Sequence, residues 1–223
     1  RTVEESTQKW LGTPIGIAKG DFSVVDPLIT RMGDNALLEF INKVQMMVSG
    51  AKISSTALFT NDIKGWGSGP VSLRDVNAVY IYANTLKVIR VSGQDIKSAL
   101  ERCASYFTIQ DGKIAVNESW VSPKPQHYNY DVWEGIDYTI DVSKPIGERV
   151  VQLEFEGKPL QMDGEYEVVL NNYRAGGGGN YPMFQGKPVV KDIMMEVAEL
   201  LSDYILTMGE IEATVDSNWK VIQ

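Results

Sequence analysis

Hydrophobic and polar positions along the chain follow two rhythms, a helical spacing of three or four residues and the shorter apolar runs typical of strands. Apolar side chains recur at helical spacing from Asp34 to about Val48, and Asp34 is a suitable helix cap. Three further helices are predicted, beginning at Ser72 (SLRDVNAV) and spanning 93–106 and 190–206. Strands are predicted over 51–59, 78–82, 86–91, 136–142, 149–155, 166–171 and 219–222.

Turns and loops separate these elements. A loop rich in Gly, Asn and Asp is predicted over 60–70, and one rich in Pro, Trp and Tyr over 120–135. The strands and helices mix without the regular βαβ rhythm of a doubly wound sheet, so the pattern predicts the α+β class. Residues 1–20, in which a polar helix gives way to a Gly-Thr-Pro breaker, are expected to form a lead-in or linker, and residues 21–223 one domain.

Composition narrows the range of partners. The chain has 223 residues and a net charge of −8, which argues against binding to a nucleic acid polymer through a basic face. Cys103 is the single cysteine, so no intrachain disulfide is possible. No apolar run reaches the roughly 20 residues that span a bilayer. Because the sequence begins at Arg1 in a polar stretch, it is expected to be a fragment or a mature product.

Several catalytic chemistries are excluded or poorly supported. The sequence Gly186-Lys187-Pro188 does not fit a phosphate-binding Walker loop, and no βαβ unit surrounds the glycine run 176–179. Zinc and dinuclear sites normally draw on several His or Cys, whereas the chain has only His127 and Cys103. An all-carboxylate site stays open, although no Asp/Glu cluster shows ligand spacing. His127 has no nucleophile motif as a partner, so a structural hydrogen bond is its expected role.

The glycine run itself is the most distinctive feature. Four glycines follow an apolar strand, and Tyr173 and Tyr181 bracket them. Glycine lets the backbone take positive φ and approach a ligand closely. The run therefore predicts a ligand platform with a flat ring beside it.

Four long motifs in order carry a family resemblance. They are NNYRAGGGGNYPMF (171–184), VYIYANTLKVIRVSG (79–93), HYNYDVWEGIDYTIDVSKPIGERV (127–150) and DSNWKVI (216–222). Together they resemble the C-terminal domain of the bacterial 5′-nucleotidases, especially the branch that hydrolyses 2′,3′-cyclic nucleotides and includes trifunctional nucleotide phosphoesterases of Gram-positive bacteria.

The resemblance implies a four-layer α/β/β/α arrangement with mixed sheets that binds the nucleoside. In that family a separate N-terminal metallophosphoesterase domain carries two divalent metal ions and the catalytic Asp-His pair, and its motifs are absent here. The chain is therefore expected to hold no catalytic residue and no metal ligand, and to be inactive alone as a hydrolase. The resemblance also implies a monomer, with the N-terminal domain in cis, in a secreted, cell-wall-associated or periplasmic protein.

The resemblance also implies a binding site. The base would lie between the rings of Tyr82 and Tyr181, with Asn84 meeting a base edge. The glycines of the run would let the backbone pass close to the ligand, and Asp192 would lie near the ribose. The glycines concerned are Gly177, Gly178 and Gly179. Tyr80 alternates with Tyr82, so one of the two is expected to face the core.

One departure from the family concerns an arginine. Many relatives place an arginine after the strand that here ends near residue 59, whereas this chain reads TNDIKGW over 60–66. Asn61 and Lys64 are the candidate substitutes. Tyr173 and Arg174 are expected to pack and pair locally. The aromatic residues of the 120–135 loop are also expected to pack, while Trp66 could shield the site or fill a core edge.

A different class of function stays open. The glycine loop could dock a protein partner, which would make the chain an interaction module without a nucleotide site. Saturable binding of a nucleoside separates the two hypotheses.

Overall fold

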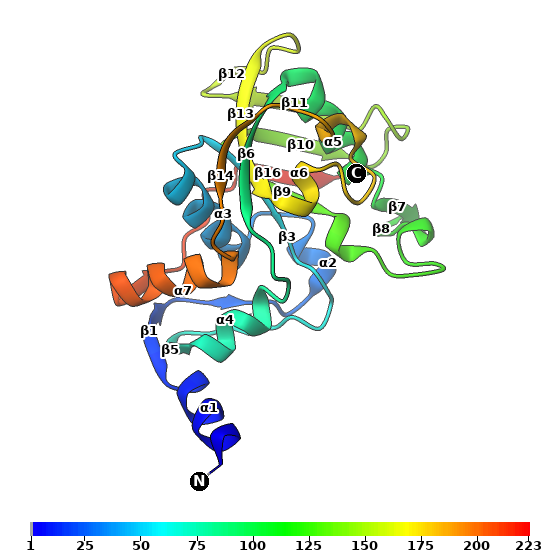
Figure 1. Cartoon of the computed structure of the whole chain (residues 1–223). Helices are drawn as coiled ribbons and strands as arrows, with labels where there is room; N and C mark the ends of the chain where they lie inside the picture. Colours follow the sequence, from blue (N-terminus) through cyan, green and yellow to red (C-terminus); the bar gives the residue numbers. More distant parts are fainter. Residues whose placement is uncertain (1) are drawn as a thin grey trace.

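The computed structural model describes residues 2–223, and Arg1 lies outside the described residues. The helices are α1 (Val3–Leu11), α2 (Pro27–Thr30), α3 (Ala36–Ser49), α4 (Leu73–Val79), α5 (Gly93–Ala104), α6 (Asn172–Ala175) and α7 (Val197–Met208). Single 3₁₀ turns are η1 (Glu118–Trp120), η2 (His127–Asn129) and η3 (Pro182–Phe184). Figure 1 shows α1 at one end of the molecule, away from the C-terminus.

The strands are short. They are β1 (Pro14–Lys19), β2 (Phe22–Ser23), β3 (Ile53–Ala57), β4 (Gly65–Trp66), β5 (Gly69–Ser72), β6 (Leu86–Ser92), β7 (Phe107–Gln110), β8 (Lys113–Val116), β9 (Asp131–Glu134), β10 (Asp137–Asp141), β11 (Val150–Phe155), β12 (Lys158–Pro159), β13 (Glu165–Asn171), β14 (Val189–Ile193), β15 (Glu210–Glu212) and β16 (Trp219–Ile222).

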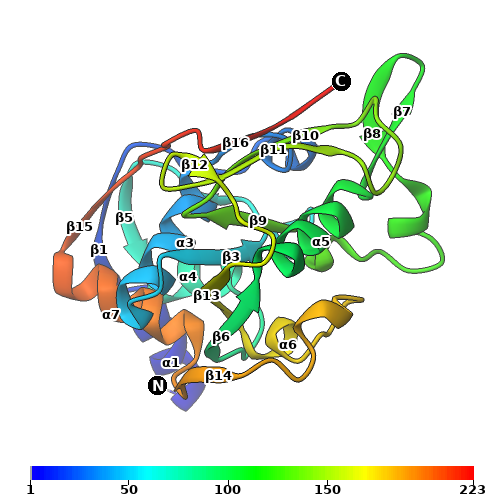
Figure 2. The same ribbon diagram turned by 90° about the horizontal axis from the view of Figure 1, so that it is seen from above.

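A five-stranded mixed sheet in the order β14-β6-β13-β3-β9 forms the centre of the fold. β13 and β3 run parallel, whereas β14, β6 and β9 join through antiparallel pairs. Every residue of β3 is buried, as expected for a strand covered on both faces. α3 packs on this sheet through β3, β9 and β13, and Figure 2 shows it alongside β3. The two parallel strands end at the same edge, which brings the loops that follow them together.

Smaller sheets complete the fold. A four-stranded sheet has the order β12-β11-β10-β16, in which β16 runs parallel to β10. A three-stranded sheet has the order β15-β1-β5, and two-stranded ladders join β2 to β4 and β7 to β8. α5 contacts β6 of the central sheet and β11 of the four-stranded one. These mixed sheets and packed helices confirm the predicted α+β class.

The segment expected to be a lead-in contains both α1 and β1. β1 pairs with β15 and β5 and so belongs to a sheet of the domain. The division of the chain at residue 20 stays a prediction. None of the helices formed by residues 2–223 has the length and apolar character needed to cross a bilayer.

Two capping boxes begin α4 and α5. In each, a serine hydroxyl accepts from the backbone N–H of an aspartate three residues on, whose carboxylate accepts in return from the serine N–H. The pairs are Ser72–Asp75 and Ser92–Asp95. The predicted helices at these positions are confirmed. α3 is also confirmed, but its cap is Asn35 rather than Asp34.

Four local predictions are wrong. The loop predicted over 60–70 contains β4 and the start of β5. The segment 78–82 is not a strand, because α4 continues to Val79 and a loop runs on to β6. The helix predicted over 190–206 is divided into β14 and α7, since the β-branched Val189–Ile193 segment finds a ladder partner in β6. The loop predicted over 120–135 contains β9, which pairs with β3. In the last two cases a distant strand decides the local structure.

Candidate functional site

Four chain segments meet at the edge of the central sheet where β3 and β13 end. Residues 59–62 follow β3, and residues 171–174 lie where β13 passes into α6. β6 and β9 run antiparallel to these strands, so the segments that precede them, 82–84 and 124–128, reach the same edge. In open α/β sheets, ligands bind beyond the carboxyl ends of the strands, and this mixed sheet offers the same geometry.

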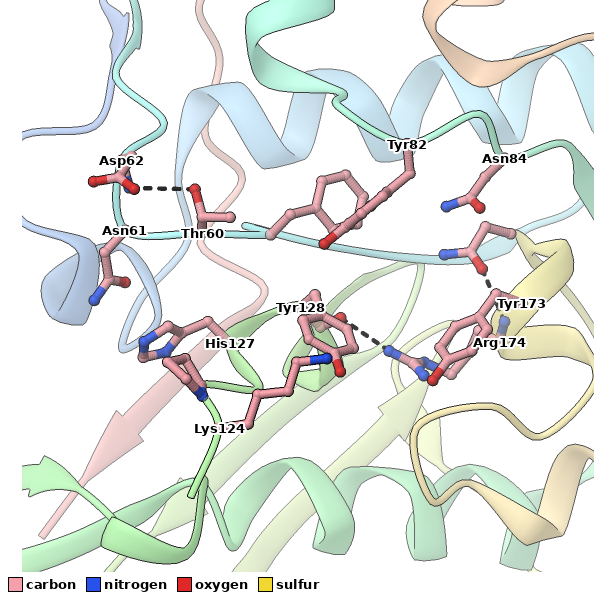
Figure 3. A pocket seen from close by; sticks show the side chains of 13 residues that line it. Thr60, Asn61, Asp62, Tyr82, Asn84, Lys124, His127, Tyr128, Tyr173 and Arg174 are labelled. Carbon is pink, nitrogen blue, oxygen red and sulfur yellow. Dashed lines mark hydrogen bonds between the residues drawn. The ribbon is translucent and has the colours of Figure 1, made fainter. Parts of the chain in front are cut away.

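These segments enclose a pocket of about 730 Å³, within the roughly 300–1,000 Å³ common for small-molecule sites. Figure 3 shows the side chains that line it. The lining residues are Phe59, Thr60, Asn61, Asp62, Tyr82, Asn84, Lys124, Pro125, His127, Tyr128, Asn171, Tyr173 and Arg174. Of the predicted binding residues, the pocket brings together Tyr82, Asn84 and Asn61.

Three tyrosine rings face this space (Figure 3). Tyr82 is 40% exposed and Tyr173 is 46% exposed. The ring of Phe59 meets Tyr82 edge-on with centroids 5.0 Å apart, and Tyr128 lies 6.4 Å from Tyr82. Burial raises the pKa of Tyr82, and the nearby hydroxyls of Tyr128 and Tyr173 add to this, so its ring is neutral at pH 7. Tyr80 is only 2% exposed, which confirms that one of the alternating pair faces the core.

A buried arginine orients Asn61. Nη1 of Arg31 donates to Oδ1 of Asn61 at 2.6 Å, and Nη2 donates to the carbonyl oxygen of Leu58 at 2.8 Å. Arg31 is 1% exposed and stands at the end of α2. Because the amide oxygen is occupied, Nδ2 of Asn61 is left as the donor for the pocket. Arg31 therefore supports this part of the pocket from behind the lining residues. It belongs to the end of α2, not to the segment after β3.

The polar rim carries charges of both signs. Lys124 is exposed, with Nζ 6.0 Å from the centre of the Tyr128 ring, and Asp62 contributes a carboxylate. Nδ1 of His127 lies 2.7 Å from Oη of Tyr106. Burial and the charge of Arg31 lower the pKa of His127, so the imidazole is neutral at pH 7. The structural hydrogen bond expected of His127 is confirmed.

Arg174 forms the floor of the pocket. Its Nε and Nη2 donate to the two carboxylate oxygens of Asp131 at 2.7 and 3.1 Å, and Nη2 also donates to the carbonyl oxygen of Tyr128 at 3.1 Å. Nη1 donates to the carbonyl oxygen of Gly178. Arg174 is 1% exposed. The local pairing expected of this residue is confirmed, and it ties the glycine loop to the segment before β9.

Tyr181 does not face the pocket, so this geometry gives no support to the prediction that its ring meets the base. It is 0% exposed, and its hydroxyl donates to the carbonyl oxygen of Asn129. Phe184 stacks on its ring at 6.0 Å with an interplanar angle of 4°. The guanidinium of Arg174 covers the ring at 4.2 Å. Because every side of this ring is occupied by protein, the second exposed ring of the site is Tyr173.

The glycine run does not line the pocket either, so the roles predicted for Gly177, Gly178 and Gly179 at the ligand find no support in this geometry. A Cβ on Gly178 would lie 2.5 Å from the ring of Tyr173, and one on Gly179 would lie 2.1 Å from Oδ1 of Asn129. Gly179 also has a φ of +78°. The glycines are needed because Tyr173 and the Arg174 cluster lie directly against this backbone.

Two further predicted residues lie outside the pocket lining. Lys64 is exposed and directly precedes β4, and its carbonyl oxygen accepts from the backbone N–H of Val24 at 2.8 Å. Asp192 lies on β14 and pairs with Lys87 at 3.4 Å. Its register partner Lys87 stands near the start of β6, so Asp192 lies towards this edge of the sheet but outside the residues that line the pocket.

Sequence reasoning missed Tyr173, Tyr128 and Lys124 as lining residues. Tyr173 had a usable signal, because it directly follows the end of an apolar strand, and such positions collect ligand contacts. Tyr128 and Lys124 gave no such signal, since their loop reaches the pocket only through the pairing of β9 with β3.

Comparison with known proteins places this geometry in a family. The sequence profile described as "5′-nucleotidase, C-terminal domain" matches residues 15–186. The chain is 30% identical, over its full length, to a 2′,3′-cyclic-nucleotide 2′-phosphodiesterase/3′-nucleotidase of Haemophilus influenzae and covers 39% of that protein. It is 24% identical over 98% of its length to the trifunctional nucleotide phosphoesterase YfkN of Bacillus subtilis and covers 17% of it.

Solved structures agree. A Staphylococcus aureus protein assigned as a 5′-nucleotidase, crystallised with α-ketoglutarate, superimposes with a TM-score of 0.92 and 35% identity over 98% of this chain. The match covers 42% of that protein. The chain thus spans less than half the length of these relatives. The expected resemblance is confirmed, and the chain belongs to the 5′-nucleotidase C-terminal domain family.

Proposed function

We propose that this domain binds the nucleoside part of a nucleotide and positions it for a metal-dependent phosphoesterase centre in another domain of a larger protein. The observation that carries the proposal is the pair of half-exposed rings, Tyr82 and Tyr173, at one pocket on the sheet edge. The names of the relatives, which are nucleotidases and cyclic-nucleotide phosphodiesterases, support the same class of ligand.

The base lies between Tyr82 and Tyr173 in this proposal. Stacking a base on an aromatic side chain contributes about 1–3 kcal/mol and tolerates different bases, because every base has a π-face. Phe59 supports Tyr82 edge-on, and the backbone at Gly178 supports Tyr173. Both rings are therefore held in place before the ligand arrives, which limits the entropy lost on binding. Asn84 offers a donor and an acceptor to the edge of the base.

The sugar and phosphate meet the polar rim. Nδ2 of Asn61 and Nζ of Lys124 are donors suited to hydroxyl and phosphate oxygens. Asp62 opposes a phosphate on the same rim, so charge alone does not fix its position. The proposal therefore assigns base recognition to the rings and only orientation to the rim.

The hydrolytic centre belongs to another domain in this proposal. The pocket contains one imidazole and one free carboxylate, His127 and Asp62, which are too few to hold two catalytic metal ions. In the whole protein, two divalent ions in an N-terminal domain would activate water and stabilise the developing charge. This domain supplies positioning, which lowers the entropic part of the barrier. The proposed substrates are 2′,3′-cyclic nucleotides, 3′-nucleotides or 5′-nucleotides, handled by a monomeric extracytoplasmic protein.

Titration of the 223-residue chain with adenosine, followed by calorimetry, tests the binding proposal. Saturable one-to-one binding is expected, and Tyr82→Ala should weaken it by roughly 5–150-fold, the equivalent of about 1–3 kcal/mol. Absence of binding at millimolar adenosine, with the fold intact, would contradict the proposal and favour a protein-interaction module.

The assignment of the chemistry to another domain has its own test. The purified chain, incubated with MnCl₂ and a 2′,3′-cyclic nucleotide, should release no product above the buffer control. Turnover that disappears in Tyr82→Ala would place the reaction within this chain and overturn the assignment.

A further inference from the structure

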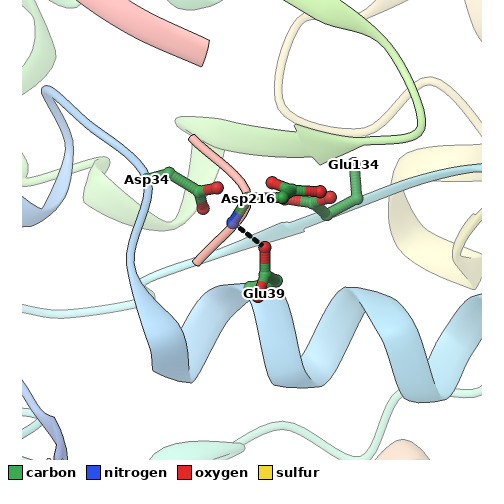
Figure 4. A group of neighbouring side chains, drawn as sticks. All are labelled: Asp34, Glu39, Glu134 and Asp216. Carbon is green, nitrogen blue, oxygen red and sulfur yellow. Dashed lines mark hydrogen bonds between the residues drawn. The ribbon is translucent and has the colours of Figure 1, made fainter. Parts of the chain in front are cut away.

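Four carboxylates gather on the side of the fold where the C-terminal segment crosses α3 and β9. Each of them offers one oxygen, and these oxygens lie within 4.8 Å of one another. Asp34 precedes α3, Glu39 lies in its first turn, and Glu134 ends β9. Asp216 comes from the segment before β16. Figure 4 shows all four side chains pointing inwards from these different elements.

Protein donors satisfy part of this cluster. The backbone N–H of Asp216 and the hydroxyl of Thr214 donate to the two oxygens of Glu39, each at 2.7 Å. The backbone N–H of Ser217 donates to Asp34 at 2.9 Å. Within residues 2–223, Lys43 is the one cation that pairs with the group, with Nζ 3.8 Å from Glu39 and 3.9 Å from Asp216. Because Lys43 is half exposed, it offsets only a small part of four negative charges.

Glu134 has no such partner. Its side chain is buried, with 2% exposure, and its Oε1 has no hydrogen-bond partner among the described residues. Figure 4 shows its carboxylate beside that of Asp216, within the group of four. An unpaired buried carboxylate is costly unless it is neutralised, paired or bound to a metal.

We propose that Asp34, Glu39, Glu134 and Asp216 form a binding site for a calcium ion. The four carboxylates each supply one oxygen ligand, and water would complete the six to eight oxygens that Ca²⁺ takes in flexible geometry. Mg²⁺ demands an octahedral arrangement and keeps several waters, so it suits a site with one or two carboxylates. The absence of His and Cys from the group disfavours zinc and copper. Asp216 is exposed, and this gives the ion a route from solvent.

The ion would join segments that are far apart in the sequence. Glu39 lies on the helix that covers the central sheet, Glu134 lies on its edge strand, and Asp216 precedes the strand that pairs with β10. Calcium would therefore fasten the C-terminal segment to the body of the domain. The site is separate from the nucleoside pocket, since none of the four residues lines that pocket.

Calorimetry and thermal unfolding of the EGTA-treated chain test this site. Titration with CaCl₂ should show one-to-one binding with a Kd below about 1 mM, and the melting temperature should rise with CaCl₂ more than with equal MgCl₂. Glu134→Gln and Asp216→Asn should each weaken calcium binding at least tenfold. Asp203→Asn, which removes an exposed carboxylate on α7, should leave it unchanged.

Two outcomes would overturn the proposal. The first is a melting temperature of the unmodified chain that does not respond to 10 mM CaCl₂, a result that needs no variant to fold. The second is calcium binding that is equally strong in Glu134→Gln and Asp216→Asn.

Discussion

Tyr173 and Tyr181 stand on either side of the same four glycines, yet their surroundings are opposite. Tyr173 is 46% exposed at the pocket, whereas Tyr181 is 0% exposed and hydrogen-bonded inside the domain. Arg174 lies between them. Its guanidinium covers the ring of Tyr181 and donates hydrogen bonds to the carboxylate of Asp131. The glycine run thus joins a binding ring to a structural ring. Changes on the two sides should affect ligand affinity and stability separately.

The largest expected effect is on stability. Arg174→Ala leaves the buried carboxylate of Asp131 without its partner, which should cost about 3–5 kcal/mol of unfolding free energy. Arg90→Ala breaks the exposed pair with Glu167 and should cost no more than about 1 kcal/mol. Urea unfolding of both variants measures the difference, and equal losses would contradict the structural role of Arg174.

The next effect separates the two rings. Tyr173→Ala should weaken adenosine binding by about 1–3 kcal/mol and change unfolding free energy by less than about 0.5 kcal/mol. Tyr181→Phe loses the hydrogen bond to Asn129 and should cost about 1–3 kcal/mol of stability while binding stays the same. Calorimetric titration gives the adenosine-binding free energy of each variant, and urea unfolding gives its unfolding free energy. The reverse pattern would place the base against Tyr181.

Two neighbouring glycines sharpen the contrast. In Gly178→Ala the new Cβ would lie 2.5 Å from the ring of Tyr173, so the ring must move. Adenosine affinity should therefore fall, though less than in Tyr173→Ala. In Gly179→Ala the residue is held at φ +78° against Asn129, so stability should fall by about 1–3 kcal/mol. The same pair of assays applies. Unchanged adenosine affinity in Gly178→Ala would show that the loop does not position Tyr173.

The smallest effect is on pH dependence. The pKa of His127 is lowered in the folded state by burial and by Arg31, from an unfolded value of 6.5. Below that value the unfolded chain binds more protons, so the contribution of His127 to stability falls as pH decreases and is fully present above it. Urea midpoints from pH 5 to 7.5 should show a steeper slope in the unmodified chain than in His127→Gln. Identical slopes would contradict a lowered pKa.

Local rules predicted the elements whose signals lie within the chain segment itself. The helices at Ser72 and Ser92 were predictable because a serine and an aspartate three residues later form a complete cap. β14 was not predictable, because only its pairing with β6 makes this segment a strand rather than the beginning of the helix that follows. Its β-branched residues sit next to good helix formers, and the sheet decides between the two states.

The same distinction holds for the site. Tyr82 and Asn84 were predictable because a motif places them together in one loop. The choice between Tyr173 and Tyr181 was not predictable, because it depends on which ring the buried Asp131–Arg174 pair covers. Asp131 precedes Arg174 by 43 residues in the chain. Arg31 supports Asn61 in the same way, from a helix end 30 residues away.

NMR of the chain with ¹³C-labelled tyrosine rings tests the central claim most directly, because it reports on each of the ten tyrosines without mutation. Ring-current shifts act over a few ångströms, so a stacked base changes only the rings that it touches. On addition of adenosine, the ring signals of Tyr82 and Tyr173 should shift in parallel to saturation, while that of Tyr181 stays in place. A saturable shift of Tyr181 with an unmoved Tyr173 would contradict the account.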